Sequence, residues 1–211
     1  MEWLSDEERF KAIEENLKLI REDIAEAARL TQLTWGDEMS LTNEDLKSVL
    51  YEAMVRYYFR SESFSFKLAD DDGMQGFLLA APLAERDHSQ EWLTKALAPF
   101  TCEEQDLVYN YLRYLSYNGQ RVRALSKPED LLLCLFLSRK SGVGSRLLQK
   151  VEAAAKAQGI KKLFLWADAT CDYAYYRRRG YSEVEQFTNT LLPELGAQET
   201  WIYRKSDNYG D

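Results

Sequence analysis

The stretch Arg139-Lys140-Ser141-Gly142-Val143-Gly144-Ser145-Arg146 lies between two segments of different hydrophobic period. Residues 130–138 before it form a continuous apolar run, which predicts a strand buried on both faces. Residues 143–158 repeat apolar side chains at helical spacing. Glycines at such a turn let backbone amides approach a ligand, and the positive end of the helix dipole favours an anion. With its three basic side chains, the stretch predicts a site for a pyrophosphate.

Two familiar phosphate-binding loops do not match this stretch. A Walker A loop ends in Gly-Lys-Ser or Gly-Lys-Thr, whereas Lys140 precedes both glycines. The dinucleotide fingerprint needs a third glycine at the position of Leu147. A Gly-x-Gly turn is a weak signal by itself, so ATP binding by the same loop stays open as an alternative.

The last third of the chain alternates strand and helix patterns. A second strand is predicted over 161–167 and a short helix over 171–179. Two further strand patterns cover 181–188 and 198–204. The strand–helix–strand order implies that the strands on either side of the helix over 143–158 run parallel.

Two helices are predicted at the beginning of the chain. The first follows a capping box at Ser5 and Glu8 and ends before Gly36. Its apolar stripe is either a core-facing side, which we favour, or a dimer seam that would make the chain a homodimer. The second helix is capped by Thr42 and Asn43. The first stripe comprises Phe10, Ile13, Leu17, Ile20 and Ile24, and the second comprises Leu46, Val49, Leu50, Ala53 and Met54.

A hairpin is predicted next. Phe64, Phe66 and Leu68 alternate with polar residues, as in a half-buried strand. The turn Asp70-Asp71-Asp72-Gly73 leads into a returning strand over 75–81. The acidic turn lacks the ligand spacing of an EF-hand, so we expect it to be solvated.

The pattern between the hairpin and the apolar strand is helical over 90–116. Pro99 interrupts it, because proline removes a helical hydrogen bond. Residues 118–129, which contain Gly119 and Pro128, are predicted to be a connection.

Composition excludes several classes of function. The 211 residues include 27 Lys and Arg against 35 Asp and Glu, and the net charge of -8 opposes nucleic-acid binding. His88 is the only histidine, which excludes centres that need two or more histidines, and we expect no metal. Cys102, Cys134 and Cys171 form no C-x-x-C pattern, which favours a reducing compartment. Cys171 has no histidine near it in sequence, which favours a structural role over an acyl-carrying nucleophile.

Residues 1–8 are acidic and lack the apolar core of a signal peptide. The longest aliphatic stretch, 131–137, is far shorter than the ~20 residues of a membrane-spanning helix. We therefore expect a cytoplasmic protein with no membrane partner.

Two motifs point to one family. The pattern Gln/Arg-x-x-Gly-x-Gly/Ala between a strand and a helix is matched in register by residues 139–144. A Tyr, three residues, a Gly and an aromatic residue are matched by Tyr176-Arg177-Arg178-Arg179-Gly180-Tyr181. In these motifs and in the order of its elements, the chain resembles the GCN5-related N-acetyltransferases (GNAT) over about 130–188.

The resemblance implies an α/β fold of the α+β type, with a mixed, mostly antiparallel sheet flanked by helices and with extra N-terminal helices. We expect one acyl-coenzyme A N-acyltransferase-like domain over 1–211. It would comprise N-terminal helices (1–60), a hairpin and helices (61–129) and a coenzyme A-binding core (130–205). The implied activity is transfer of the acetyl group of the cosubstrate acetyl-coenzyme A to a small-molecule or peptide amine, by direct attack in a ternary complex. The alternative is a non-catalytic acyl-coenzyme A sensor or regulatory module.

The resemblance also assigns roles to residues. Tyr176 would be the general acid that protonates the leaving thiolate, and its position relative to Gly180 favours it over Tyr175. The end of the preceding strand would pair with the pantetheine arm, whose amides can act like an added strand. The loop amides would bind the pyrophosphate. The strand end comprises Cys134, Leu135 and Phe136, and the loop comprises Arg139, Lys140, Ser141, Gly142, Val143, Gly144 and Ser145.

Two points stay open at this stage. Ala169 stands where many family members have Asn, so either that coenzyme contact is absent here or Thr170 or Asp172 replaces it. The amine must also lose a proton, for which Asp168, Asp172 and Glu85 are candidates by position. Each of these carboxylates also fits a surface or capping role.

Overall fold

The structure is a computed structural model that describes residues 18–36, 41–192 and 196–206. Within these ranges, no helix combines the length and apolarity needed to cross a membrane. The strands are β1 (Phe66–Asp70), β2 (Gly73–Pro82), β3 (Leu131–Ser138), β4 (Lys162–Asp168), β5 (Ser182–Asn189) and β6 (Gln198–Ser206). The helices are α2 (Ile24–Trp35), α3 (Glu44–Tyr58), α4 (Gln90–Leu97), α5 (Cys102–Leu125), α6 (Val143–Ala157) and α7 (Tyr173–Arg178), with short turns η1 (Arg21–Asp23) and η2 (Glu62–Phe64).

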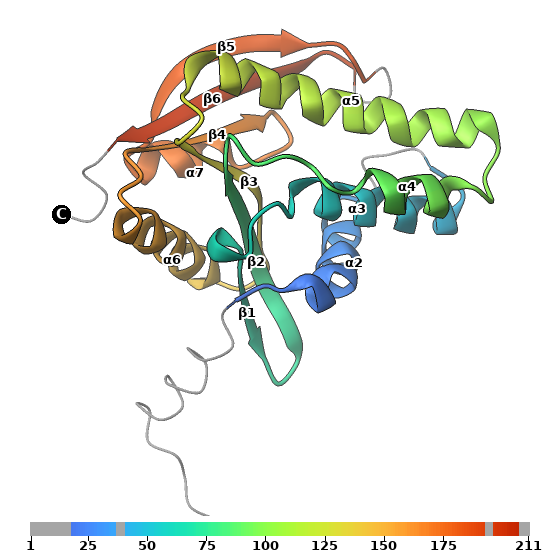
Figure 1. Cartoon of the computed structure of the whole chain (residues 1–211), viewed down its shortest axis with the longest axis horizontal. Helices are drawn as coiled ribbons and strands as arrows, with labels where there is room; N and C mark the ends of the chain where they lie inside the picture. Colours follow the sequence, from blue (N-terminus) through green and yellow to red (C-terminus); the bar gives the residue numbers. More distant parts are fainter. Residues whose placement is uncertain (1–17, 37–40, 193–195, 207–211) are drawn as a thin grey trace, which may run out of the picture.

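The strands form one sheet in the order β1-β2-β3-β4-β6-β5. Among the described strands, β3 and β4 are the parallel pair, as predicted, and the other neighbours are antiparallel. Helices flank the sheet, and α5 runs alongside the β4–β6–β5 half (Figure 1). The predicted mixed, mostly antiparallel sheet is confirmed.

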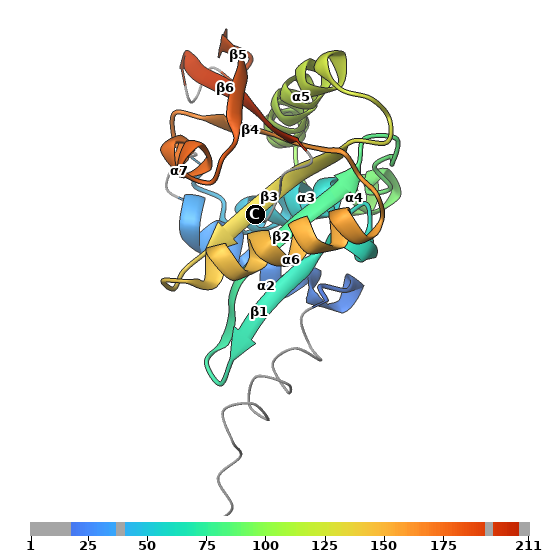
Figure 2. The same cartoon turned by 90° about the vertical axis from the view of Figure 1, so that its left-hand side faces the viewer.

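Helices pack on both faces of the β1–β2–β3 half of the sheet, with α6 on one side and α2 and α3 on the other (Figure 2). β2 is buried along most of its length because its side chains alternate between these two layers. Leu78 and Ala80 belong to the core beneath α6, whereas Phe77 and Leu79 belong to the core beneath α2 and α3.

A bulge in β3 changes the face that its leucines cover. Cys134 has no partner in β2, because the register shifts between Leu133 and Leu135. Before the bulge, Leu131 and Leu133 pack in the core beneath α6. After it, Leu135 and Leu137 pack in the opposite core with α2 and α3. Such a bulge bends a strand and redirects its side chains, so one leucine-rich run serves both layers.

β3 and β4 are neighbours over two residues only. Leu131 pairs with Leu163 and Leu132 with Phe164. Beyond that point β4 stays alongside β6 as far as Asp168, while β3 stays alongside β2. The two parallel strands therefore diverge towards their carboxyl ends.

Glycines let the start of α6 lie close to the sheet. A Cβ at Gly76 of β2 would lie 2.6 Å from the carbonyl oxygen of Leu137 and 2.8 Å from Cγ1 of Val143, the first residue of α6. A Cβ at Gly144 would lie 3.2 Å from the ring of Phe136. Close helix–sheet packing at this point therefore requires small residues at both positions.

The connection predicted over 118–129 is wrong in its first half, because α5 continues to Leu125. Val108, Leu115 and Val122 lie seven residues apart and form a buried stripe along α5. Burial of this stripe outweighs the cost of Gly119 inside a helix, which is about 1 kcal/mol.

The first predicted helix also differs from the structure. Ile20 has extended backbone and is exposed, and α2 begins only at Ile24. The reason is that Leu19 donates its amide to the carbonyl oxygen of Ser65 at 3.0 Å, so this segment joins the chain before β1 instead of a helix. The dimer seam stays a prediction, since its residues Phe10, Ile13 and Leu17 lie outside the described ranges.

The close approach at Gly76 generates a stability prediction. We expect Gly76→Ala to lower the free energy of unfolding by about 1–3 kcal/mol, because the new methyl group overlaps backbone and Val143. Gly119→Ala is the matched control: it adds the same group inside α5, where no atom lies within 4 Å, and should raise stability by up to about 1 kcal/mol. Urea denaturation of both variants measures the difference. Equal stability of Gly76→Ala and the unsubstituted chain would contradict the packing described.

Candidate active site

An open groove lies over the turn between β3 and α6. One wall is the glycine loop, which contributes five of the predicted site residues. The other wall comes from α7 and the turn before it, including Thr170, Cys171 and Tyr175. The loop residues that line the groove are Lys140, Ser141, Gly142, Gly144 and Ser145.

Backbone amides at the start of α6 are available to an anion in this groove. Gly142 has φ of 83°, a left-handed conformation that ends the loop and begins the helix. Helix geometry leaves the first-turn amides of Gly144 and Ser145 without an acceptor inside α6. Two predicted donors are already used, because Arg139 donates its amide to Gln75 and Val143 donates to Lys140. Consistently, neither Arg139 nor Val143 lines the groove.

The acidic hairpin turn is exposed, as predicted, and it also contacts the glycine loop. Lys140 Nζ lies 2.6 Å from Asp70 Oδ2 and 3.5 Å from Asp72 Oδ2. This pairing raises the pKa of Lys140 and lowers the pKa of Asp70. Part of the loop's positive charge is therefore compensated by the β1–β2 turn.

A further cation reaches the loop from the end of α7. Arg179 donates from Nη2 to the hydroxyl oxygen of Ser145, and its guanidinium lies 5.2 Å from the centroid of the Tyr175 ring. Sequence reasoning assigned the local positive charge to Arg139, Lys140 and Arg146 and missed this residue. Its only sequence signal was its place in the arginine run before Gly180.

A more enclosed cavity lies where β3 and β4 diverge. β3 contributes Cys134, Leu135 and Phe136, the three residues predicted to contact the pantetheine arm, and β4 contributes Trp166 and Asp168. α3 and α5 close it with aromatic side chains. These are Tyr58 from α3 and Tyr111 and Tyr114 from α5.

Tyr176 lies where the groove and the cavity meet. It lines both hollows, whereas Tyr175 lines only the groove. Burial, with smaller contributions from Cys171, Tyr175 and Asp172, raises the pKa of Tyr176 above the ordinary range. The phenol therefore stays protonated at neutral pH, as a proton donor must.

Asp168 is a buried carboxylate in the cavity, at the end of β4. Tyr114 donates to its Oδ2 at 2.6 Å. Thr170 donates to its Oδ1 from the amide at 3.1 Å and from the hydroxyl at 2.7 Å. Thr170, which directly follows the position of the family Asn, thus orients Asp168.

The other two carboxylate candidates do not reach the cavity. Asp172 caps α7 by accepting from the amide of Tyr175 at 3.2 Å, and it pairs with Arg178. Glu85 is exposed in the turn after β2 and lines neither hollow. Of the three candidates, Asp168 alone lines the cavity.

The two cysteines of the site, Cys134 and Cys171, are half-buried thiols. Burial, followed by the charge of Asp168, raises the pKa of Cys171 to about 12. Burial raises the pKa of Cys134 to about 11. Both are therefore protonated at neutral pH, which favours the structural role expected for Cys171. The described residues include no group of three or more Asp, Glu, His or Cys arranged to bind a metal.

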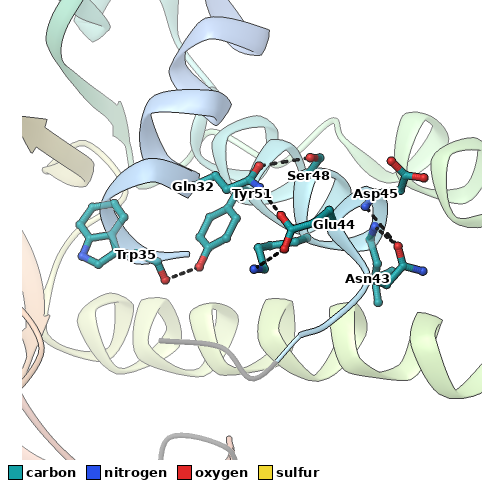
Figure 3. A network of polar contacts seen from close by, with 9 residues as sticks. Gln32, Trp35, Asn43, Glu44, Asp45, Ser48 and Tyr51 are labelled. Carbon is teal, nitrogen blue, oxygen red and sulfur yellow. Dashed lines mark hydrogen bonds and ion pairs between the residues drawn. The ribbon is translucent and has the colours of Figure 1, made fainter. Parts of the chain in front are cut away.

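Trp35, which sequence reasoning missed, joins the N-terminal helices to the site. It lines both hollows from the last residue of α2. Tyr51 of α3 donates to its carbonyl oxygen at 2.5 Å, and Gln32 links the same helix end to Ser48 and Glu44 (Figure 3). The contacts between α2 and α3 therefore hold Trp35 in place. A tryptophan directly before a helix-ending glycine was its only sequence signal.

Comparison with known proteins supports the resemblance inferred from the sequence. The model of the acetyltransferase (GNAT) family matches residues 138–181, which span the glycine loop, α6, β4 and α7. A search of curated proteins finds no match.

Solved structures share the fold over nine-tenths of the chain. SsHAT has a TM-score of 0.58 at 16% identity, covering 90% of this chain and 96% of its own. An agmatine N-acetyltransferase in its apo form has a TM-score of 0.54 at 12% identity, covering 90% and 98%. A putative GNAT acetyltransferase from Desulfovibrio desulfuricans has a TM-score of 0.52 at 15% identity, covering 90% and 96%.

These identities establish the fold rather than the reaction. The family match falls on the residues that build the groove and the Tyr176 junction. The chain therefore has the GNAT fold and carries the GNAT family sequence pattern over residues 138–181, and the resemblance is confirmed.

Proposed function

We propose that the protein is an N-acetyltransferase that uses acetyl-coenzyme A and transfers its acetyl group directly to an amine. The observation that carries this proposal is the position of Tyr176, which lines both the groove at the glycine loop and the cavity between β3 and β4. A coenzyme that lies in the groove and extends along β3 would meet an acceptor in the cavity at this phenol.

The groove is suited to the coenzyme. The free amides of Gly144 and Ser145 and the dipole of the 15-residue helix α6 favour a pyrophosphate. The edge of β3 that faces away from β2 is not covered by β4 beyond Leu132, so it can pair with the amides of a pantetheine arm. Bound acetyl-coenzyme A would supply the activated acetyl group and the thiolate leaving group.

The chain's own groups can complete the transfer. Asp168 accepts a proton from the ammonium group of the acceptor, which frees the nitrogen lone pair. The nitrogen–carbon bond to the acetyl group forms as the carbon–sulfur bond breaks. Tyr176 donates its phenolic proton to the departing sulfur and regains one from the acylated nitrogen through solvent. Much of the rate would come from holding the amine and the thioester together.

Tyr176→Phe tests the role of the phenol. We expect kcat to fall about 100-fold or more, because general acid catalysis contributes at least that factor, while the Kd of coenzyme A barely changes. Thiol release across a panel of amines measures kcat, and calorimetry measures Kd. Tyr117→Phe is the control, since Tyr117 packs on Phe187 and lines neither hollow.

Two results would contradict this role. Tyr175→Phe losing as much activity as Tyr176→Phe would move the acid to the neighbouring residue. Tight binding of acetyl-coenzyme A without acetylation of any amine by the unsubstituted protein would favour an acyl-coenzyme A sensor. Preference for ATP over coenzyme A would favour a nucleotide-binding protein instead.

The glycine loop supports a paired prediction. Gly142 and Gly159 flank α6, both have positive φ, and a Cβ at either position meets no atom within 4 Å. Each Ala variant should therefore cost about 1–2 kcal/mol of stability from backbone strain alone. Only Gly142→Ala should also weaken coenzyme A binding, by about tenfold, because it displaces amides that contact a charged ligand. Equal coenzyme A affinities for the two variants would exclude the loop as the binding site.

Direct attack predicts that the half-buried cysteines of the site carry no acyl group. At pH 8 we expect iodoacetamide to alkylate the exposed Cys102, whereas Cys134 and Cys171 stay protonated and unlabelled, with activity retained. Mass spectrometry of peptides identifies the labelled residues, and labelling in urea shows that all three can react. Rapid alkylation of Cys171 with matching loss of activity would indicate an acyl-cysteine route.

A further inference from the structure

We infer that the acceptor is a compact primary monoamine with an apolar body and no carboxylate or phosphate, whose ammonium group binds at Asp168. The inference rests on the proposed acetyl transfer and goes beyond it by specifying the acceptor. It depends on three features of the cavity between β3 and β4: its buried charge, its aromatic walls and an unpaired hydroxyl.

The buried charge of Asp168 lacks a cationic partner. Asp168 is 6% exposed, and its carboxylate accepts hydrogen bonds from Tyr114 and Thr170. No Lys or Arg in the described ranges forms an ion pair with it. A buried carboxylate is stabilised most strongly by a cation, and an ammonium ligand in the cavity supplies one.

Aromatic rings line the same cavity as this carboxylate. Tyr114 packs edge-on against Trp166 with ring centroids 5.9 Å apart, and Tyr111 lies 6.2 Å from Tyr114. Tyr58 and Trp35 complete this aromatic lining. Ring faces attract a cation, and their area favours an apolar body over a polyhydroxylated one.

An unpaired hydroxyl provides a second, independent sign of a ligand. Tyr58 lines the cavity and is 2% exposed, yet its Oη is buried without a hydrogen-bond partner. Leaving such a group unpaired is costly, and an N–H of the bound ammonium can donate to it.

The lining also disfavours acceptors that carry an anionic group. None of the described residues that line the cavity is Lys, Arg or His. Arg60 packs against the Tyr57 and Tyr58 rings at 4.7 and 6.0 Å, but it does not line the cavity. The charge of Arg60 acts on Cys134 and Tyr58 from behind this lining. An amino acid would therefore place its carboxylate near Asp168 with no Lys, Arg or His among the described lining residues to pair with it.

The experiment compares two probes that differ only in a carboxylate. With acetyl-coenzyme A saturating, we expect kcat/KM for 2-phenylethylamine to exceed that for phenylalanine by about 100-fold or more, because a buried unpaired anion is strongly rejected. Thiol release measures both rates. Equal values, or a preference for phenylalanine or for a peptide N-terminus, would overturn the inference.

Variants separate charge recognition from packing. Asp168→Asn keeps the size of the side chain but removes its charge, so 2-phenylethylamine should bind at least about tenfold more weakly. Its neutral analogue 2-phenylethanol should bind the variant and the unsubstituted protein equally, which a merely structural role would not produce. Asp130→Asn is the matched control, since Asp130 is a buried carboxylate that caps a turn outside the cavity.

The unpaired hydroxyl is tested in the same way. Tyr58→Phe should weaken 2-phenylethylamine binding several-fold and leave the coenzyme A affinity unchanged, because only the cavity loses a polar group. Tyr117→Phe, from the neighbouring helix α5, should change neither affinity. Unaltered amine binding by both Tyr58→Phe and Asp168→Asn would place the acceptor elsewhere.

Failure of the inference and failure of acetyl transfer are distinguishable. If 2-phenylethylamine binds in a manner that depends on Asp168 but no thiol is released, the proposed reaction is contradicted and the assignment of the cavity is supported. Thiol release with phenylalanine as readily as with 2-phenylethylamine would retain the reaction and remove the assigned acceptor.

Discussion

β3 and β4 pair over only two residues, and then each strand follows a different neighbour. This divergence is the constraint on which the site depends. The bulge at Cys134 accompanies it, since an unpaired residue bends β3 and shifts its leucines from one helical layer to the other. A sheet with continuous pairing would fill the space between these strands with backbone hydrogen bonds and leave no cavity. Here the same space receives Trp166 and Asp168 from one strand and Phe136 from the other.

The proposed anion site depends on how closely α6 lies against the sheet. Gly76 and Gly144 allow that approach, and Gly142 turns the chain so that α6 begins directly after the loop. Gly144 and Ser145 of the first helical turn then line the groove, which shares Tyr176 with the cavity. Lys140 is held by the β1–β2 turn, and Arg179 joins the loop from α7. The local charge at this groove is therefore set by three segments that are distant in sequence.

The proposed acid, Tyr176, and the proposed base, Asp168, are distinguished by their surroundings as much as by their residue type. Desolvation raises the pKa of Tyr176 further above neutrality, and in the proposed reaction its place between the two hollows lets it meet the leaving thiolate. Asp168 is oriented by Tyr114 and Thr170 within aromatic walls. These walls come from α2, α3 and α5, the helices for which the sequence shows no motif. Most of the aromatic lining therefore comes from outside the family match, whereas Asp168 and Trp166 lie within it.

Local sequence patterns determined most elements and the identity of the loop. The apolar run of β3, the Gly-x-Gly turn and the Tyr176–Tyr181 motif each depend on neighbouring residues. They can therefore be recognised from the sequence alone. Where long-range packing competes with local preference, prediction failed: α5 continues through Gly119, and Ile20 is extended. Only the tertiary structure selected Asp168 over Asp172 and Glu85 and brought Trp35 and Arg179 to the site. Those placements depend on the divergence of β3 and β4 and on the packing of distant helices. They could not be predicted from the sequence, because the end of strand pairing leaves no periodic signal in it.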